Sequence, residues 1–192
     1  DEEDNHSFMG GDLHCTGRLD IDTEGLLILT TDGSLTHKLI SPKSEISKKY
    51  AITLRDSVNS ENQQKYIDAC KTGIEIPPEG KEAGFTSLPA TLDFSSDNTC
   101  FLTITEGKYH QVKRMMEAVD CHVESLKRVT FGPIVLPSDL EEGCFRPLTK
   151  EEVELVLKYN KDDVDATYEE LKIKYDQVLS KVNLVRMYNL PK

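Results

Sequence analysis

An apolar run from Gly25 to Thr31 limits most narrowly how this chain can fold. The run reads GLLILTT and is followed by Asp32-Gly33, a pair typical of turns. Short apolar runs bounded by turn residues are typical of buried strands. Because a buried strand fixes its own backbone, a carboxylate just ahead of it can be held rigidly at the mouth of a cleft. The candidate is Asp20, in the preceding GRLD sequence.

Helices and strands are both predicted along the rest of the chain, without a regular alternation of the two. Apolar periodicity with capping residues predicts helices, whereas apolar runs between turn residues predict strands. The predicted helices cover residues 35–40, 60–72, 108–119, 150–159 and 165–182, and the predicted strands cover 49–54, 88–94, 100–105, 122–131 and 133–136. This order predicts an α+β fold with a largely antiparallel mixed sheet that helices flank.

The net charge limits the classes of function. A formal net charge of −11 is unfavourable for binding nucleic acid, since phosphate contacts need Lys and Arg. The charge is uneven, however, because the stretch 106–128 carries five Lys and Arg residues against four acidic ones. A local basic groove is therefore compatible with this acidic chain.

The cysteines and the hydropathy pattern predict the compartment. The five cysteines are widely spaced without zinc-site spacing, which predicts reduced thiols in a cytosolic compartment and no bound metal. No apolar run approaches the ~20 residues that span a bilayer, so we expect no membrane partner. The acidic start of the chain is also unlike the basic start of a signal peptide, and we expect no export.

A second informative segment, EGKYHQVKRMM at 106–116, combines a glycine with a dense group of basic residues. Gly107 lets the backbone turn after a strand and start a helix whose first turn is cationic. A cation at this place can either keep a buried carboxylate ionised or hold a phosphate. Taken alone, a basic helix face can equally be an ordinary solvated surface.

Together the two segments resemble the signature motifs of the RsuA-type pseudouridine synthases. The matching sequences are GRLD and TEGLL within 17–27, KKYAI at 48–52, EGKYHQVKRM at 106–115, LKRVTFG at 126–132 and GCFRPLT at 143–149. These motifs follow one another in the family's order, and the resemblance covers residues 16–157. The sequence YHQVKR at 109–114 is more similar to the motif of the family's small-subunit 16S rRNA enzyme than to the motifs of its large-subunit relatives.

The resemblance implies an isomerase that breaks the N-glycosidic bond of a uridine in RNA, rotates the base and rejoins it through carbon. Asp20 is the implied catalytic carboxylate, and whether it acts on the ribose or on the uracil ring stays open. Lys113 is the implied ion-pair partner that keeps Asp20 charged. Tyr50 is implied to lie against the flipped uracil. The implied RNA-binding residues are Arg18, Lys108, His110, Gln111, Arg114 and Arg128.

The resemblance also implies the partners and the cofactors. The RNA partner is small-subunit rRNA or its precursor, the protein is expected to act as a monomer, and no metal or organic cofactor is implied. A cytoplasmic location is expected, with an organelle as the open alternative. Plainer roles stay open for two residues: Tyr50 as an ordinary aromatic residue of a strand, and Arg18 as a surface ion-pair partner.

The start of the chain departs from the family pattern. Family members usually have a Lys-Pro-x-Gly strand, and often a small basic RNA-binding domain, ahead of the first motif, and residues 1–16 contain neither. We therefore interpret 1–16 as a flexible or truncated segment, 17–158 as the catalytic domain and 159–192 as a helical extension. The missing strand predicts a gap in the sheet beside the active site unless residues outside this chain supply it. Asp120 replaces a glycine of the family, which Asp tolerates because it adopts left-handed backbone more readily than most residues.

Two other functions compete with the isomerase. The first is a catalytically idle RNA-binding or ribosome-assembly module of the same fold. The truncated start and the acidic charge favour it, whereas the joint presence of Asp20, Tyr50 and Lys113 disfavours it. The second is an unrelated hydrolase that uses two carboxylates. It would need a second acid beside Asp20, and one strand cannot aim Asp22 and Glu24 at the same substrate as Asp20.

Overall fold

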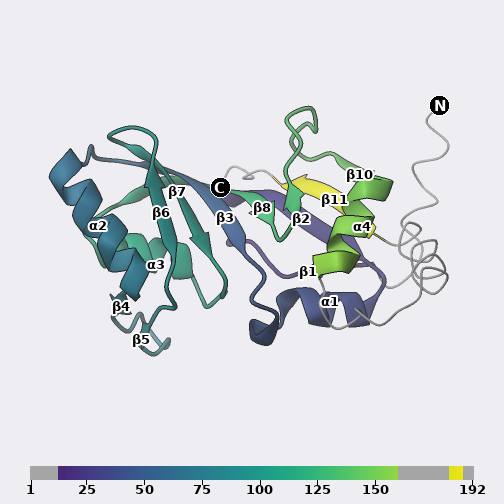
Figure 1. The fold of residues 1–192 in the computed structure, drawn as a ribbon, viewed down its shortest axis with the longest axis horizontal. Helices are drawn as coiled ribbons and strands as arrows, with labels where there is room; N and C mark the ends of the chain where they lie inside the picture. The colour runs from purple at the N-terminus through teal and green to yellow at the C-terminus, as the bar shows by residue number, and fades with distance from the viewer. Residues whose placement is uncertain (1–12, 160–181, 188–192) are drawn as a thin grey trace.

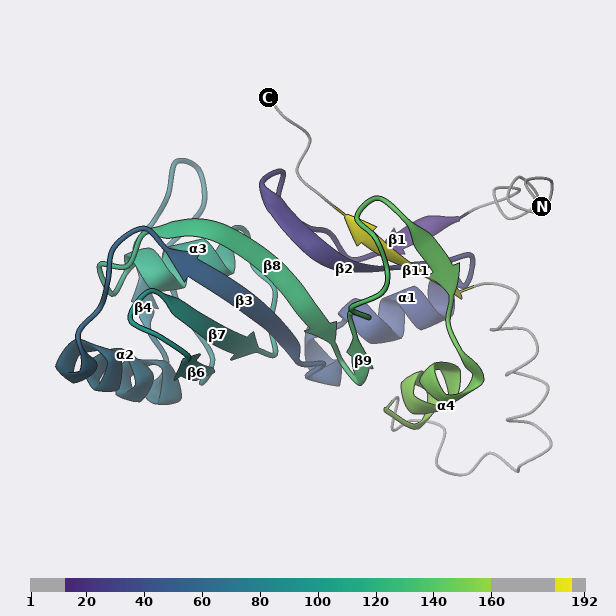
Figure 2. The ribbon, with the colours of Figure 1, turned by 90° about the horizontal axis from the view of Figure 1, so that it is seen from above.

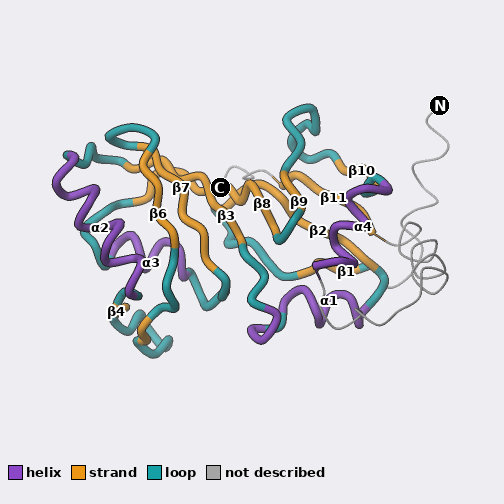
Figure 3. Tube along the Cα trace, viewed as in Figure 1, coloured by secondary structure: helices purple, strands orange, loops and turns teal. Residues whose placement is uncertain are grey.

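The computed structural model describes residues 13–159 and 182–187. Within them, one mixed sheet of nine strands forms the centre of the molecule, and helices lie around it (Figure 1; Figure 3). The strands are β1 His14–Thr16, β2 Thr23–Thr30, β3 Lys48–Leu54, β4 Glu75–Ile76, β5 Phe85–Thr86, β6 Thr91–Phe94, β7 Thr99–Ile104, β8 Val123–Phe131, β9 Ile134–Val135, β10 Phe145–Pro147 and β11 Val182–Met187. The helices are α1 Gly33–Ile40, the short 3-10 helix η2 Pro42–Ser44, α2 Ser60–Thr72, α3 Gln111–Glu117 and α4 Lys150–Tyr159. No helix of the described residues is long and apolar enough to cross a membrane.

The sheet has the strand order β10-β11-β2-β8-β3-β7-β6, and the short β4 and β5 pair separately. Among the described strands, β2 and β8 are the one parallel pair, and the other pairs are antiparallel. The predicted α+β fold with a largely antiparallel mixed sheet is therefore confirmed.

A glycine allows β2 and β8 to approach each other closely. Gly25 lies opposite Arg128 in the parallel pair, and its φ of +111° is in a region that side chains rarely adopt. A Cβ atom at this position would lie only 2.3 Å from the carbonyl oxygen of Arg128. The glycine of the TEGLL motif is thus required by the backbone geometry beside the site described below.

Two hydrophobic cores lie at the two ends of the sheet. One packs α2 and α3 against β3, β6 and β7, and it includes the fully buried Leu102 and Met115. The other packs α1 and α4 against β2 and the end of β8, and it includes Leu26 and Val153. Figure 2 shows the long strand β8 curving from the side of α3 to β9, near α1. Strand β8 contributes to both cores, through Leu126 and Phe131, and so connects the two ends.

Most predicted elements are present in the structure. The predicted helices 60–72 and 150–159 match α2 and α4, and the predicted strands match β2, β3, β7 and β8 to within a few residues. Helix α2 begins where Asn59 accepts a hydrogen bond from the amide of Asn62, and it ends at Gly73, whose φ is +93°. The predicted helix 165–182 lies almost entirely outside the described residues.

Two strands differ from the prediction. Residues 182–187 belong to the extension that we expected to be helical, but they form β11, which pairs with Gly25–Thr30 of β2. Residues 14–16 belong to the segment interpreted as flexible or truncated, but they form β1, which also pairs with β2. Both corrections have one physical reason: a strand edge presents unpaired amides and carbonyls, and partners from elsewhere in the chain satisfy them. Both strands that pair with β2 here, β1 and β11, come from within this chain.

Candidate active site

A cleft with a volume of about 580 Å³ opens where the two cores meet. Such a volume is within the range of small-molecule sites. The lining comes from the loop before β2, the end of α1 with Pro42, strand β3, the loop between β7 and α3, and strand β8. It consists of Gly17, Arg18, Leu19, Asp20, Ile21, Thr23, Ile40, Pro42, Lys48, Tyr50, Ile104, Thr105, Glu106, Gly107, Lys108, Tyr109, His110, Gln111, Val112, Leu126, Arg128 and Phe131. The two motif segments that are far apart in the sequence therefore form opposite parts of one cleft.

Asp20 belongs to a tight turn just ahead of β2. The amide of Thr23 donates a hydrogen bond to the carbonyl oxygen of Asp20 at 2.9 Å, which closes the turn and starts the strand. The carbonyl of Arg18, in the same loop, accepts a hydrogen bond from the guanidinium of Arg128 at 3.4 Å. The same guanidinium donates to the carbonyl of Leu26 at 2.8 Å. Arg128 thus ties the loop that carries Asp20 to strand β2.

Tyr50 reaches the cleft from the centre of β3. It lies opposite Arg128 of β8, and its side chain is almost entirely buried. Lys48 lines the same cleft, because residues two apart in a strand share one face of the sheet. Asp20 and Tyr50, which the sequence motifs singled out together, thus line one cleft, and their catalytic roles stay predictions.

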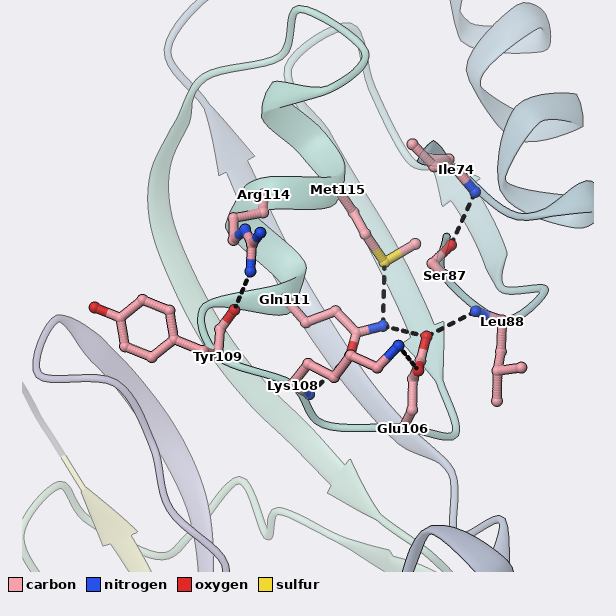
Figure 4. Close-up of polar contacts among 9 residues, drawn as sticks. All are labelled: Ile74, Ser87, Leu88, Glu106, Lys108, Tyr109, Gln111, Arg114 and Met115. Atoms are coloured by element: carbon pink, nitrogen blue, oxygen red, sulfur yellow. Dashed lines mark hydrogen bonds and ion pairs between the residues drawn. The ribbon is translucent and has the colours of Figure 1, made fainter. Parts of the chain in front are cut away.

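A buried polar cluster of Glu106 and Gln111 supports the other wall of the cleft (Figure 4). The carboxylate of Glu106 accepts hydrogen bonds from Gln111 at 2.6 Å and from the amide of Leu88 at 2.7 Å. It also forms an ion pair with Lys108 at 3.2 Å. The side-chain oxygen of Gln111 in turn accepts from the amide of Lys108 at 2.9 Å. Gln111 was expected to bind RNA, but these contacts show that it also fixes the loop that follows β7.

The helix that follows this loop is shorter than predicted. The sequence predicts a helix over 108–119, whereas α3 covers only Gln111–Glu117. His110 has a left-handed backbone with φ of +47°, and the hydrogen bond from Lys108 to the side chain of Gln111 replaces the first helical turn. Asp120 has a φ of +59° after the helix, in agreement with the left-handed conformation that its replacement of a glycine suggested.

The ion pair of Lys113 differs from the prediction. Lys113 was expected to pair with Asp20, but its ammonium pairs with Asp22 instead. The reason is geometric: the turn closed by Thr23 leaves the Asp22 side chain 57% exposed, and Asp22 and Lys113 both lie outside the lining of the cleft that Asp20 belongs to. The hydrogen bond from Lys113 lowers the pKa of Asp22, against the opposing effect of its partial burial. Lys113 therefore anchors the turn that carries Asp20 through the neighbouring carboxylate.

The predicted RNA-binding residues divide into two groups. Five of them line the cleft, namely Arg18, Lys108, His110, Gln111 and Arg128. Arg114 does not: its side chain is 5% exposed and donates hydrogen bonds to the carbonyls of Pro77, Ala83 and Tyr109. This placement favours a structural role, in which Arg114 holds the segment between β4 and β5, over the RNA contact that the sequence suggested.

Two residues of the cleft were missed by sequence reasoning. Glu106 was noted only as part of a motif, although its carboxylate is the centre of the polar cluster. Lys48 was noted only as part of the KKY sequence. Burial, together with the nearby charge of Arg128, lowers the pKa of Lys48 to about 8. The alternation along β3 could have placed Lys48 beside Tyr50, since the two are the first and third residues of the strand and therefore share one face of the sheet.

Replacing Gln111 with leucine tests the polar cluster. Gln111→Leu removes one of the three partners of the buried Glu106 carboxylate and leaves the Lys108 amide without its hydrogen bond, so the free energy of unfolding should fall by about 1–3 kcal/mol. Denaturant unfolding followed by circular dichroism measures this change. Gln64→Leu is the matched control, because Gln64 is an exposed residue of α2 that bonds only to Asp68 in the described contacts. Equal stabilities of the two variants would contradict a supporting role for the cluster.

The fold and the cleft together define a class, that of proteins with the pseudouridylate synthase fold. The chain aligns with a structure titled "Crystal structure of pseudouridylate synthase" with a TM-score of 0.69 and 42% sequence identity, over 79% of this chain and 64% of that chain. A family model described as RNA pseudouridylate synthase matches residues 3–118, more than half of the chain. The chain therefore belongs to the RNA pseudouridylate synthase family.

Curated relatives carry the same family name. The chain is 45% identical, over 150 residues, to "Ribosomal small subunit pseudouridine synthase A" of Haemophilus influenzae, covering 78% of this chain and 61% of the relative. It is 40% identical to the protein of the same name in Escherichia coli, covering 76% of this chain and 59% of the relative. These findings confirm the resemblance to the RsuA-type enzymes. The chain spans about 60% of the length of these relatives.

Proposed function

We propose that this chain isomerises a uridine of RNA to pseudouridine, and that the uridine lies in small-subunit rRNA. The observation that carries the proposal is that Asp20 and Tyr50 line one cleft of about 580 Å³ together with basic side chains. A nucleobase that leaves its helix needs a pocket with a stacking residue and a reacting group. The names of the relatives support rRNA as the class of RNA.

The proposed roles of the residues are those that the resemblance to the family implies, and their places in the cleft are compatible with them. Asp20 supplies the carboxylate that acts on the ribose or the uracil ring while the N1–C1′ bond breaks. Tyr50 lies against the extruded base, which rotates so that C5 bonds to C1′. The proton of C5 is lost and N1 gains one, so the reaction is an isomerisation without a net change in atoms. Arg18, exposed at the edge of the cleft, supports the extruded strand.

The deciding experiment incubates the chain with unmodified small-subunit rRNA and maps pseudouridine chemically. We expect product from the native chain and a loss of about 10²–10⁴-fold or more for Asp20→Ala, the range that a reacting side chain contributes. Asp56→Ala is the control, because Asp56 is exposed and pairs with the adjacent Arg55. A native chain without product would favour the idle RNA-binding module. Equal rates for native chain and Asp20→Ala would exclude Asp20 as the reacting group.

The substrate is rRNA of the small subunit or its precursor, the protein acts as a monomer, and the reaction takes place in the cytoplasm. These statements stay predictions. Sedimentation of the chain with and without RNA measures its oligomeric state and so tests whether it is a monomer.

A further inference from the structure

The floor of the cleft contains two cations that lie close together. Lys48 of β3 and Arg128 of β8 both line the cleft, and both lie near the ring of Phe131, at 5.5 Å and 5.1 Å from its centroid. Arg128 is 2% exposed, and one of its terminal nitrogens is buried without a hydrogen-bond partner. Like charges placed side by side in a partly buried site repel each other, so this arrangement calls for an anion.

No carboxylate of the described residues forms an ion pair with either cation. Lys48 donates only a long hydrogen bond of 3.4 Å to the carbonyl of Ile46, and Arg128 donates to the carbonyls of Leu26 and Arg18. The other lysine of the cleft is different, because Figure 4 shows Lys108 turned to Glu106, which neutralises it. Lys48 and Arg128 thus keep their charges available within a chain whose net charge is −11.

The charges of the lining as a whole favour an anionic ligand. Four cationic side chains line the cleft, namely Arg18, Lys48, Lys108 and Arg128, against two carboxylates, Asp20 and Glu106. Because Glu106 is already bonded to Lys108, Gln111 and Leu88, only Asp20 is left to balance the other three cations. This excess of positive charge is best neutralised by a group with a full negative charge and several acceptor oxygens. In a nucleotide that group is the phosphate.

We propose that Lys48 and Arg128 form a phosphate subsite, in which Lys48 binds the backbone phosphate of the nucleotide in the cleft and Arg128 supports it. This inference rests on the proposed function and adds to it the group that the floor of the cleft recognises. Lys48 makes the contact, because its side chain is partly exposed to the cleft. Arg128 is a positioning residue: it adds positive charge from behind and holds the Arg18 carbonyl.

The test compares the binding of uridine 5′-monophosphate with that of uridine by calorimetry. We expect the native chain to prefer the monophosphate, and Lys48→Met to weaken that preference by about tenfold, the effect of one charge-assisted hydrogen bond, with uridine affinity unchanged. Lys49→Met is the matched control: Lys49 is the next residue of β3 and lies over Phe101 on the opposite face, at 4.6 Å. Lys48→Arg should keep the preference, which separates loss of charge from misfolding.

The pH dependence gives a second measurement. With the pKa of Lys48 lowered to about 8, its positive charge is present below that pH and is lost above it, so the preference for the monophosphate should decline between pH 8 and 10. The other titratable or charged groups that line the cleft are Arg18, Asp20, Tyr50, Glu106, Lys108, Tyr109, His110 and Arg128. Lys48→Met should lack this decline.

Three results would overturn the subsite: an unchanged preference in Lys48→Met, an equal loss in Lys49→Met, or no preference for the monophosphate in the native chain. Any of these results alongside normal pseudouridine formation would contradict the subsite alone. A preference that depends on Lys48, in a chain that forms no pseudouridine, would contradict the proposed function alone.

Discussion

Replacing Gly25 with alanine is expected to lower the free energy of unfolding by roughly 3 kcal/mol or more. The new Cβ atom would lie 2.3 Å from the carbonyl oxygen and 2.7 Å from the amide nitrogen of Arg128, and neither can move without separating β2 from β8. The φ of +111° adds backbone strain of about 1–3 kcal/mol, and overpacking adds a similar amount. Thermal and denaturant unfolding of the purified variant measure the loss.

Gly33→Ala is the matched control for this substitution. Gly33 lies at the start of α1, and a Cβ atom there would meet nothing within 4 Å. Alanine also forms helices better than glycine, so this variant should be as stable as the native chain or slightly more stable. A Gly25→Ala variant with native stability would mean that β2 and β8 are not paired as closely as the structure shows.

Replacing Lys113 with methionine is expected to reduce pseudouridine formation by about 10- to 100-fold. Lys113 pairs with Asp22, two residues from Asp20 in the same turn, so its loss should release the turn and displace the Asp20 carboxylate. A displacement of the reacting group by about 1 Å can reduce the rate by up to about 100-fold. Single-turnover rates on small-subunit rRNA measure the effect, and filter binding shows whether RNA is still bound.

The partner of Lys113 can be identified with a double-mutant cycle. If Lys113 acts through Asp22, Asp22→Asn should reduce the rate about as much as Lys113→Met, and the double variant should be no slower than either single variant. If Lys113 instead contacts Asp20 during the reaction, Asp22→Asn should be nearly as active as the native chain. That second result would restore the pairing that the sequence motifs suggested.

Local sequence signals predicted the parts of this fold that depend on neighbouring residues. Helix α2 was predicted to the residue, because Ser60 marked its start and Gly73 its end. The strand β2 was evident from its apolar run, and the motifs identified the loop of Asp20 and the strand of Tyr50 before the structure showed that both line one cleft.

The rest depends on contacts between distant residues, which local patterns do not contain. Lys113 pairs with Asp22 and not with Asp20 because of the direction of a turn, which no sequence motif specifies. The role of Arg114 depends on the carbonyls of the segment between β4 and β5, and β11 depends on an open edge of β2. The charge of the cleft floor likewise arises only when β3 and β8 bring Lys48 and Arg128 together.

The pairing of β11 with β2 has a consequence for how the protein is made. A strand synthesised early must wait for a partner synthesised much later, and closing so long a stretch of chain is slow. The open edge of β2 is exposed during that time, which makes it a site where chaperones or other nascent chains can bind. Strand β2, which follows the loop of Asp20, thus gains its β11 partner only after all the residues between the two strands have been synthesised.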